Sequence, residues 1–162
     1  MNKVIIVGGG AAGMLCSIIA ARNGCEVFLF EKNEKLGKKL YITGKGRCNV
    51  TNNCEVEELL RAVMTNSKFL YSAFYTFNSQ DMMALLEEAG VPLKTERGNR
   101  VFPESDRSSD IIRGLERLMK KYGVHVRFRS EVREILTQDG AAVGVSLADG
   151  EIKRADAVVV AT

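Results

Sequence analysis

The sequence contains a single histidine in 162 residues, and its four cysteines form no CxxC pair. Zinc sites are built mainly from histidine and cysteine at short, fixed spacings, so we expect no metal site. Cys16 and Cys25 lie among apolar residues and are predicted to be small buried hydrophobic side chains. The cysteine usage favours a reducing, cytoplasmic compartment.

A strong excess of one charge is also absent, because the formal net charge is only +3. This value is too small to indicate nucleic-acid binding by itself. The hydrophobic content of 46% and the charged content of 27% are typical of a folded globular protein. The sequence has no internal repeat and no low-complexity linker, and its length suits one domain or slightly more.

The long uncharged run over residues 4–21 does not predict a membrane helix. It follows Lys3 and superficially meets the rules for a membrane span or a signal peptide. However, Gly8-Gly9-Gly10 and Gly13 interrupt it, and each glycine costs a helix about 1 kcal/mol relative to alanine. A strand, a turn and a helix are the better interpretation, so we expect no membrane association.

This first region is predicted to be a complete strand–helix–strand unit. The β-branched run at residues 4–7 is typical of a strand buried on both faces of a parallel sheet. A helix is predicted from about residue 11 to residue 23, where Gly24 ends it. A second buried strand, at residues 27–30, ends at Glu31.

A helical region follows a polar loop. Residues 54–90 are predicted to form two or three helical pieces, because apolar residues recur there at helical spacing. Short strands and turns are expected around the segment ERGNRVFP, and a further helix over residues 109–122 is ended by Gly123. One apolar stripe of the helical region consists of Phe69, Leu70, Phe74 and Phe77.

The last quarter of the chain is predicted to form strands. Asp139-Gly140 and Asp149-Gly150 stand where hairpin turns belong, which predicts a three-stranded meander. The last strand, AVVVA, is predicted to be buried, and it runs directly into Thr162. A domain seldom stops inside its own sheet, so we expect the sequence to be the N-terminal part of a longer protein. The predicted strands cover residues 124–128, 132–137, 142–147, 152–154 and 157–161.

The glycines of the first turn are spaced as Gly8-x-Gly10-x-x-Gly13. This spacing is informative here because a predicted strand precedes it and a predicted helix follows the turn. Gly8 permits a tight turn, Gly10 lets the backbone approach a pyrophosphate, and Gly13 allows close packing of helix and strand. The N-terminus of the helix then offers free N–H groups to the phosphates.

Glu31 follows eighteen residues after Gly13 and is placed to accept hydrogen bonds from both hydroxyls of an adenosine ribose. A 2′-phosphate there would face a carboxylate, which disfavours NADP in this first site. The pattern predicts a site for an ADP moiety, and the alternative is a glycine turn that binds nothing. FAD and NAD share that moiety. A third parallel strand that arrives only near Val124, followed by a meander, favours FAD by fold-level analogy.

Three stretches, VIIVGGGAAGMLCSIIAARNG, EKNEKLGKKLYITGKGRCNVTN and RVFPESDRSSDII, closely resemble the BaiN/RdsA-type (YhiN-like) family of bacterial NAD(P)/FAD-dependent oxidoreductases. Relatives also carry the label "aminoacetone oxidase family". The resemblance covers essentially residues 1–162 and implies a Rossmann-like α/β FAD-binding domain, incomplete at its C-terminus, with a helical excursion at about 54–90. A substrate-side domain and the rest of the FAD domain are implied to be absent. The implied cofactor-binding residues are Gly8, Gly10, Ala12, Gly13, Glu31, Lys32, Lys39, Gly46, Arg47 and Val132.

The resemblance also gives a role to the loop TGKGRCNVTN, residues 43–52, which with Lys39 would wrap the extended FAD between its pyrophosphate and its isoalloxazine. Its glycines would let backbone N–H groups approach the cofactor closely. Arg47 would pair with phosphate or with negative charge on reduced flavin, and the backbone of Val132 would meet the adenine. The alternative is a solvated surface loop with helix-capping asparagines.

Cys48 and Cys54 raise a further alternative, because a redox cysteine pair also follows the first strand–helix–strand unit in flavin disulfide reductases. Five residues separate these two, and pairing depends on geometry that a sequence does not show. Cys48 is therefore interpreted as structural or adjacent to the cofactor. His125 alternates with apolar residues in a strand and is expected to be exposed or partly hydrogen-bonded rather than catalytic. No residue is a convincing proton donor, so the catalytic residues stay unassigned.

By resemblance, the intact protein passes a hydride from NADH or NADPH through FAD to an activated carbon–carbon double bond of a small molecule. A second hypothesis is a flavin-dependent reductase of uracil in ribosomal RNA, which would form dihydrouridine and would present a broad basic face. A third is a module that binds FAD without turnover. The first hypothesis predicts an apolar substrate pocket in a domain outside residues 1–162.

Overall fold

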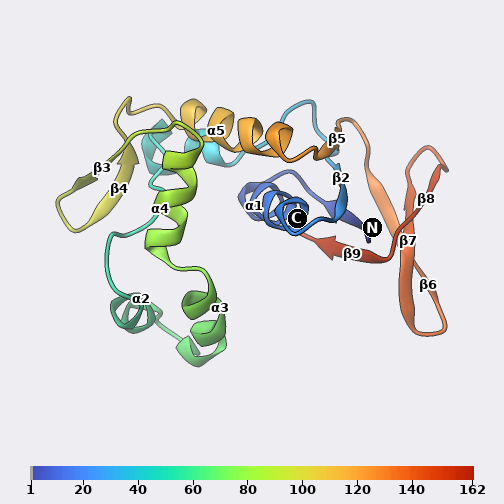
Figure 1. Cartoon of the computed structure of the whole chain (residues 1–162), viewed down its shortest axis with the longest axis horizontal. Helices are drawn as coiled ribbons and strands as arrows, with labels where there is room; N and C mark the ends of the chain where they lie inside the picture. Colours follow the sequence, from blue (N-terminus) through green and yellow to red (C-terminus); the bar gives the residue numbers. More distant parts are fainter. Residues whose placement is uncertain (1) are drawn as a thin grey trace. The chain divides into compact units, whose positions relative to one another are not determined.

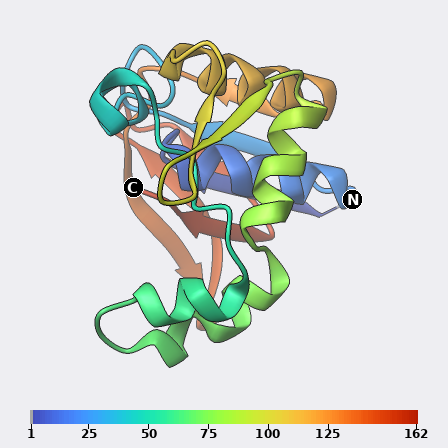
Figure 2. The same ribbon diagram turned by 90° about the vertical axis from the view of Figure 1, so that its left-hand side faces the viewer.

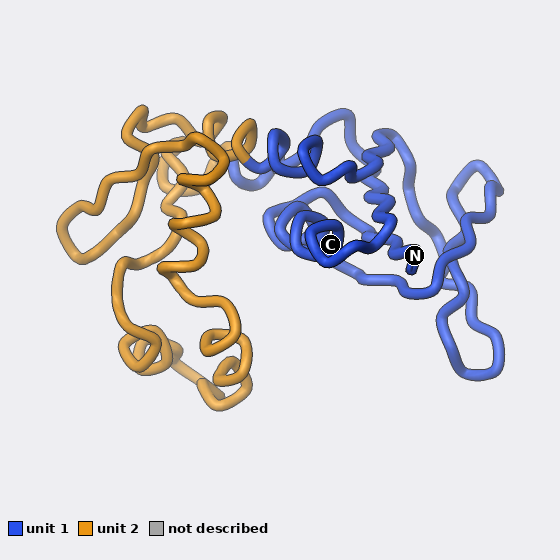
Figure 3. Tube along the Cα trace, viewed as in Figure 1, with its two compact units in different colours: residues 1–40, 115–162 blue, residues 41–114 orange. Residues whose placement is uncertain are grey.

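A computed structural model describes residues 2–162, so Met1, the first residue of the predicted 1–162 domain, lies outside the described residues. The chain forms two compact units, which Figure 3 colours separately. Unit 1 consists of Met1–Leu40 and Leu115–Thr162, and unit 2 consists of Tyr41–Gly114. In sequence, unit 2 is thus inserted into unit 1.

Unit 1 is built around a four-stranded parallel sheet with the strand order β5-β2-β1-β9. Val4 of β1 pairs with Val27 of β2 on one side and with Ala157 of β9 on the other. β1 is therefore a central strand, while β9 pairs only with β1 and forms an edge. The four strands are β1 (Lys3–Val7), β2 (Glu26–Phe30), β5 (His125–Arg127) and β9 (Ala157–Val160).

Apolar side chains project from both faces of this sheet and are buried on each face. The helix α1 (Ala11–Arg22) contacts β1 and β2 (Figure 1). Ile5 and Phe30 form a buried cluster with two residues of β7 (Ala141–Leu147). Because side chains alternate along a strand, the neighbouring residues Ile6 and Leu29 point to the opposite face, where both are fully buried.

The strand β7 is the middle of a three-stranded antiparallel meander that completes unit 1. It pairs with β6 (Val132–Gln138) and with β8 (Ile152–Arg154). Asp139 and Gly140, between β6 and β7, have φ angles of 52° and 78°, as a two-residue hairpin turn with left-handed residues requires. The predicted hairpins at Asp139-Gly140 and Asp149-Gly150 are both confirmed.

Unit 2 has four short helical pieces over residues 56–88, of which η2 and α3 are contiguous (Figure 1 and Figure 2). α2, η2 and α3 contact one another, and α4 contacts β3, one strand of an antiparallel hairpin. The remaining elements are η1 (Leu40–Gly46), α2 (Val56–Ala62), η2 (Ser67–Leu70), α3 (Tyr71–Thr76), α4 (Ser79–Glu88), β3 (Leu93–Glu96), β4 (Arg100–Pro103) and α5 (Ser108–Lys121), whose last turns belong to unit 1.

The apolar stripe at residues 69–77 is helical but not fully covered: Phe69 is 79% exposed, because the helices beside it are short and pack mainly on one another. Two predictions of burial are wrong. Val160 of β9 is 59% exposed, because an edge strand is covered by a neighbour on one side only. Cys16 and Cys25 are only half-buried.

The predicted α/β class is confirmed: a parallel sheet with helices and a three-stranded meander, in a Rossmann-like arrangement. The strand–helix–strand start of the chain, β1-α1-β2, also agrees with the prediction to within one residue at each boundary. Across residues 2–162, no helix combines the length and the apolar character that a membrane crossing requires.

Candidate dinucleotide-binding site

The turn between β1 and α1 has the backbone that its glycines predict. Gly8 has a φ angle of +105°, which residues other than glycine rarely adopt. Its N–H donates to the Phe30 carbonyl at 2.9 Å. A methyl group at Gly13 would lie 1.9 Å from the Gly8 carbonyl oxygen. Both glycines are therefore required by the fold of the turn itself, whether or not a ligand binds.

Gly10 differs from these two, because a methyl group built on it meets no atom within 4 Å. It is the N-cap of α1, has an ordinary φ angle of −79°, and makes no capping bond through a side chain. The first helical hydrogen bond runs from the Met14 N–H to the Gly10 carbonyl at 2.9 Å. The N–H groups of the first turn thus have no partner within the helix, and that turn carries no acidic residue. Such an end favours an anion.

Glu31 lies directly after β2 and is only 7% exposed. Its Oε2 accepts the Gly9 N–H at 2.7 Å, which ties it to the glycine turn. Its Oε1 accepts both the N–H of Asn33 at 2.8 Å and the side-chain amide of Asn33 at 2.6 Å. The carboxylate is therefore oriented by three N–H donors beside the glycine turn, and its interaction with a ribose stays a prediction.

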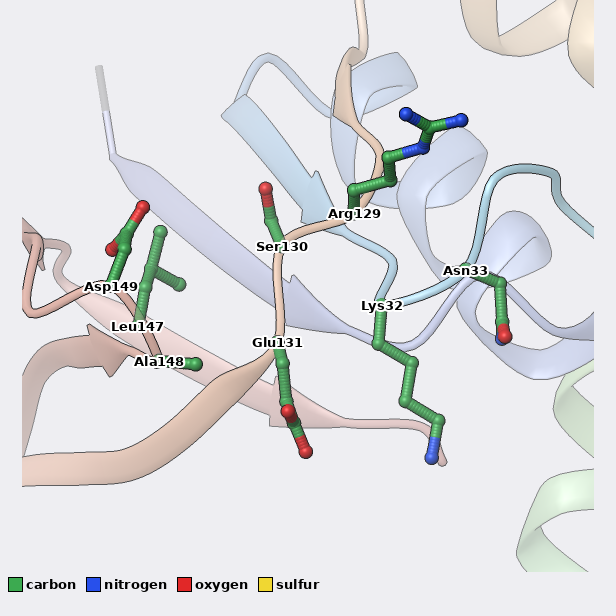
Figure 4. Close-up of a pocket in the computed structure, with 8 residues that line it drawn as sticks. All are labelled: Lys32, Asn33, Arg129, Ser130, Glu131, Leu147, Ala148 and Asp149. Atoms are coloured by element: carbon green, nitrogen blue, oxygen red, sulfur yellow. The ribbon is translucent and has the colours of Figure 1, made fainter.

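A pocket of about 390 Å³ opens next to these groups in unit 1 (Figure 4). Glu131 and Lys32 extend their side chains in a similar direction in this view. Val132, predicted to meet the adenine, begins β6 immediately after Glu131. The lining residues are Lys32, Asn33, Arg129, Ser130, Glu131, Leu147, Ala148 and Asp149.

The predicted site residues fall into both units. Unit 1 brings together the glycine turn, Ala12 at the start of α1, and Glu31 with Lys32. Lys39 is an exposed residue of unit 1. Gly46 and Arg47 belong to unit 2, and their predicted contact with the cofactor stays a prediction.

The loop at residues 43–52 has an unusual backbone. Gly44, Lys45, Gly46 and Cys48 all have positive φ angles, between 54° and 84°. A methyl group at Gly44 would lie 2.7 Å from the backbone nitrogen of Asn49, so the loop folds back tightly on itself. Conformations of this kind persist only when their surroundings hold them.

Arg47 supplies part of that hold. Its Nε donates to Asp106 at 2.8 Å, its guanidinium also pairs with Glu96, and it stacks over the Phe102 ring with 4.0 Å to the centroid. The hydrogen bond from Arg47 lowers the pKa of Glu96 below its ordinary value. The hydrogen bond from Lys94, followed by that from Arg47, lowers the pKa of Asp106. Arg47 thus ties the loop to the β3–β4 hairpin and the turn after it.

Cys48 is the most buried of the four cysteines, at 2% exposure, and all four are free thiols. Burial raises the pKa of the Cys48 thiol, although a hydrogen bond with Thr43 acts in the opposite direction. Redox-active cysteines need a low pKa and access, so this environment does not support the redox-pair alternative. No group of His, Cys, Asp or Glu in residues 2–162 has the arrangement of a metal site. His125 is exposed, as expected, and its ring stacks on Phe28.

Two residues of the site are not apparent from the glycine spacing. Gly9, the middle glycine, donates to Glu31, and a methyl group on it would lie 2.3 Å from Leu36. Asn33 holds the other carboxylate oxygen. Its sequence signal is weak: asparagine often hydrogen-bonds polar groups two residues away, and Asn33 follows Glu31 at that spacing.

The fold and the site define a class of protein, a Rossmann-like domain whose glycine turn and following acidic residue are arranged for a dinucleotide. Residues 2–162 match the HI0933-like protein Rossmann domain, and the chain belongs to this family. The family predicted from the sequence is thereby confirmed.

Two curated relatives come from bacteria. The chain is 31% identical to the 3-dehydro-bile acid delta(4,6)-reductase of Clostridium scindens, over 99% of this chain and 39% of the relative. It is 34% identical to the ribosomal RNA dihydrouridine synthase of Escherichia coli K12, over 81% of this chain and 32% of the relative. The chain therefore spans between about a third and two fifths of the length of these relatives.

A solved structure supports the fold. The 3-ketosteroid-delta4-(5alpha)-dehydrogenase of Rhodococcus jostii RHA1 superposes on 99% of this chain and 46% of its own, with a TM-score of 0.75. The sequence identity is 18%, so this similarity concerns the fold alone.

Proposed function

We propose that the chain is the FAD-binding part of a flavoprotein oxidoreductase. The observation that carries this proposal is the open space at Gly10, at the uncapped N-terminus of α1, beside the oriented carboxylate of Glu31. A pyrophosphate needs close backbone approach and N–H donors, and a ribose needs an acceptor nearby. The residues present fit the ADP half of FAD.

In this proposal the chain's own residues bind and orient the cofactor. The first-turn N–H groups of α1 receive the pyrophosphate, and Glu31 receives the ribose hydroxyls. The start of β6 at Val132 and the neighbouring pocket receive the adenine. Lys32, Lys39, Gly46 and Arg47 are proposed as further cofactor contacts. The bound flavin would supply hydride transfer, with NADH or NADPH as the electron donor.

The proposed reaction of the whole protein is reduction of an activated carbon–carbon double bond in a small molecule. The name of the Clostridium scindens relative, a reductase of 3-dehydro-bile acids, supports this substrate class. The name of the Escherichia coli relative favours a second candidate, the reduction of uracil in ribosomal RNA. The identities, 31% and 34%, do not separate the two.

The first test is the visible spectrum of the purified, full-length protein, recorded without oxygen before and after adding NADH or NADPH. The proposal expects a flavin absorption band that bleaches with one of the two donors. A flavin band that persists would remove NAD(P)H as donor and favour a binding module without turnover. Absence of flavin, even after FAD is added, would contradict the proposal.

A second test separates the two substrate classes. Reduced protein is mixed with a 3-keto-4-ene steroid or with transcripts of ribosomal RNA, and the reoxidation of the flavin is followed. An RNA substrate predicts that the apparent affinity falls steeply between about 50 and 200 mM salt, because phosphate contacts release counterions. A small apolar substrate predicts little change over the same range.

A further inference from the structure

We propose that Asn33 is a positioning residue, which holds the Glu31 carboxylate in the orientation that receives the ribose of the cofactor. This inference rests on the proposed function. Asn33 donates twice to Glu31 Oε1, from its backbone N–H at 2.8 Å and from its side-chain Nδ2 at 2.6 Å. It does not itself need to touch the cofactor.

Asn33 is held in turn by two neighbours. Its side-chain Oδ1 accepts from Lys38 Nζ at 3.2 Å, which turns the Nδ2 group toward Glu31. Its backbone carbonyl accepts the Arg129 N–H at 3.0 Å, which anchors the segment after β2 to the segment after β5. Figure 4 shows Asn33 and Arg129 on these two segments of unit 1. The orientation of the amide is therefore set by the fold before any ligand arrives.

The chemistry of Glu31 explains why such support is needed. A carboxylate at 7% exposure has lost most of its hydration, and burying a charge is costly unless hydrogen bonds replace the water. Here Gly9 donates to one oxygen and Asn33 to the other. These N–H donors replace part of the lost water and fix the direction of the two carboxylate oxygens, which in the proposed site accept ribose hydroxyls and oppose a 2′-phosphate. Without the Asn33 amide, Oε1 keeps only a backbone donor, and the carboxylate gains freedom to rotate.

A double-mutant cycle tests the inference. The dissociation constant of FAD is measured by quenching of flavin fluorescence in the full-length protein, as wild type and with the substitutions Asn33→Ala, Glu31→Ala or both. We expect Asn33→Ala to weaken binding about fivefold in the wild-type background and less than about twofold when Glu31 is already alanine. Equal effects in both backgrounds, or no effect in the wild-type background, would overturn the inference.

A selectivity measurement keeps the test decisive if Glu31→Ala does not fold. Displacement of FAD by ADP and by 2′-phosphorylated ADP gives a ratio of affinities for each protein. In the wild type the dissociation constant of 2′-phosphorylated ADP should exceed that of ADP. We expect the ratio of the two constants to fall by about threefold or more in Asn33→Ala, because a mobile carboxylate repels the 2′-phosphate less. If Asn33 had a purely structural role, its loss would weaken the binding of both ligands equally. An unchanged ratio of the two affinities would therefore refute the proposed role.

Asn23→Ala is the matched control. Asn23 follows α1 at its other end, and its Nδ2 donates to the Ile19 carbonyl at 2.8 Å. We expect this variant to bind FAD and ADP as the wild type does, and a loss equal to that of Asn33→Ala would count against a role specific to Glu31. Full-length wild-type protein that binds neither FAD nor ADP would instead refute the proposed function itself.

Discussion

Gly10 and Gly13 lie three residues apart at the start of α1, yet a methyl group added to each meets different surroundings. At Gly13 it would overlap the carbonyl oxygen of Gly8, and at Gly10 it would enter open space. Gly13 is thus required by the packing of helix on strand, whereas the role of Gly10 in the proposed site is to leave room for the ligand. Single substitutions can separate these two requirements.

Gly10→Ala is expected to leave the stability of the chain almost unchanged and to weaken FAD binding by about five- to 150-fold. Its φ angle of −79° suits alanine, but the new methyl group would stand where the pyrophosphate must approach, an overlap worth about 1–3 kcal/mol. Thermal unfolding and a fluorescence titration with FAD measure the two effects. A variant that still binds FAD like the wild type would show that the ligand does not approach the helix at Gly10.

Gly13→Ala is expected to destabilise the chain by about 2 kcal/mol or more, because the Gly8 carbonyl and the backbone of α1 cannot both keep their positions around the methyl group. Urea unfolding followed by circular dichroism measures the loss. Gly10→Ala is the control with the same chemical change in the same turn. Equal stability of the two variants would contradict the packing role of Gly13.

At the scale of elements, unit 2 depends on local hydrogen bonds because its helices are short and expose much apolar surface. The start of α4 is a capping box: the Asn78 side chain accepts the N–H groups of Gln80 and Asp81, and the Asp81 carboxylate accepts the Asn78 N–H at 2.8 Å. These bonds satisfy donors that a helix of ten residues cannot satisfy internally.

Asn78→Ala is therefore expected to lower the free energy of unfolding by about 1 kcal/mol. The urea midpoint of the wild type and the variant gives this difference. Ser72→Ala, at an exposed position of α3, is the control and should shift the midpoint little. If both substitutions have the same effect, the capping box contributes nothing specific.

The tie between the 43–52 loop and the hairpin should depend on pH. Glu96 and Asp106 have pKa values below their ordinary ones in the folded chain, because they accept hydrogen bonds from Arg47 and Lys94. A carboxylate with a lowered folded pKa stabilises the fold above its unfolded pKa, and this contribution disappears as the pH falls through the folded value. Arg47→Gln should therefore destabilise the chain near neutral pH and match the wild type more closely below about pH 4.

Urea midpoints between pH 3 and pH 7 check this expectation. Arg113→Gln is the control. Arg113 is largely exposed, and its ion pair with Asp110 is long, at 3.5 Å, so the pair contributes little to stability. A difference between the wild type and Arg47→Gln that stays constant with pH would show that the stacking of Arg47 on Phe102, rather than its ion pairs, holds the loop.

At the scale of the whole molecule, FAD should stabilise the folded chain through binding alone. A ligand present at 100 times its dissociation constant adds about 2.7 kcal/mol to the free energy of unfolding. ADP should give a smaller shift, because it lacks the flavin half. Differential scanning fluorimetry compares the melting temperatures. No shift with FAD at any concentration, in a chain that is otherwise folded, would speak against the proposed site.

The sequence predicted the parts of the molecule that local chemistry decides. The turn at Gly8 needs a left-handed residue, and Asp139-Gly140 needs two, so both could be located from residue types alone. Phe69 shows the limit of this approach: helical spacing indicates an apolar face, but the length and packing of neighbouring helices decide whether anything covers it. The same holds for Val160, whose exposure follows from the position of β9 at the sheet edge.

The candidate site also contains residues that the sequence predicted and residues that it did not. Glu31 was predicted because its distance from the glycines reflects the length of one strand–helix–strand unit. The donors to Glu31 were not predicted, since Gly9 and Asn33 act through backbone and side-chain geometry that the spacing does not encode. Arg47 was assigned to the cofactor on resemblance, and its carboxylate partners lie 49 and 59 residues away in sequence, beyond the reach of local patterns.

The pairing of β1 with β9 has a consequence for how the chain is made. Asp156, just before β9, lies 153 residues from its hydrogen-bond partner Lys3. The central strand β1 therefore cannot pair with β9 until almost all 162 residues have been synthesised. At ordinary rates of synthesis that wait lasts roughly ten to thirty seconds. Unit 2, which is continuous in sequence, is complete well before then. During translation, one side of β1 is therefore an unpaired strand edge. It is open to pairing with strands of other chains, and so to aggregation, until β9 leaves the ribosome.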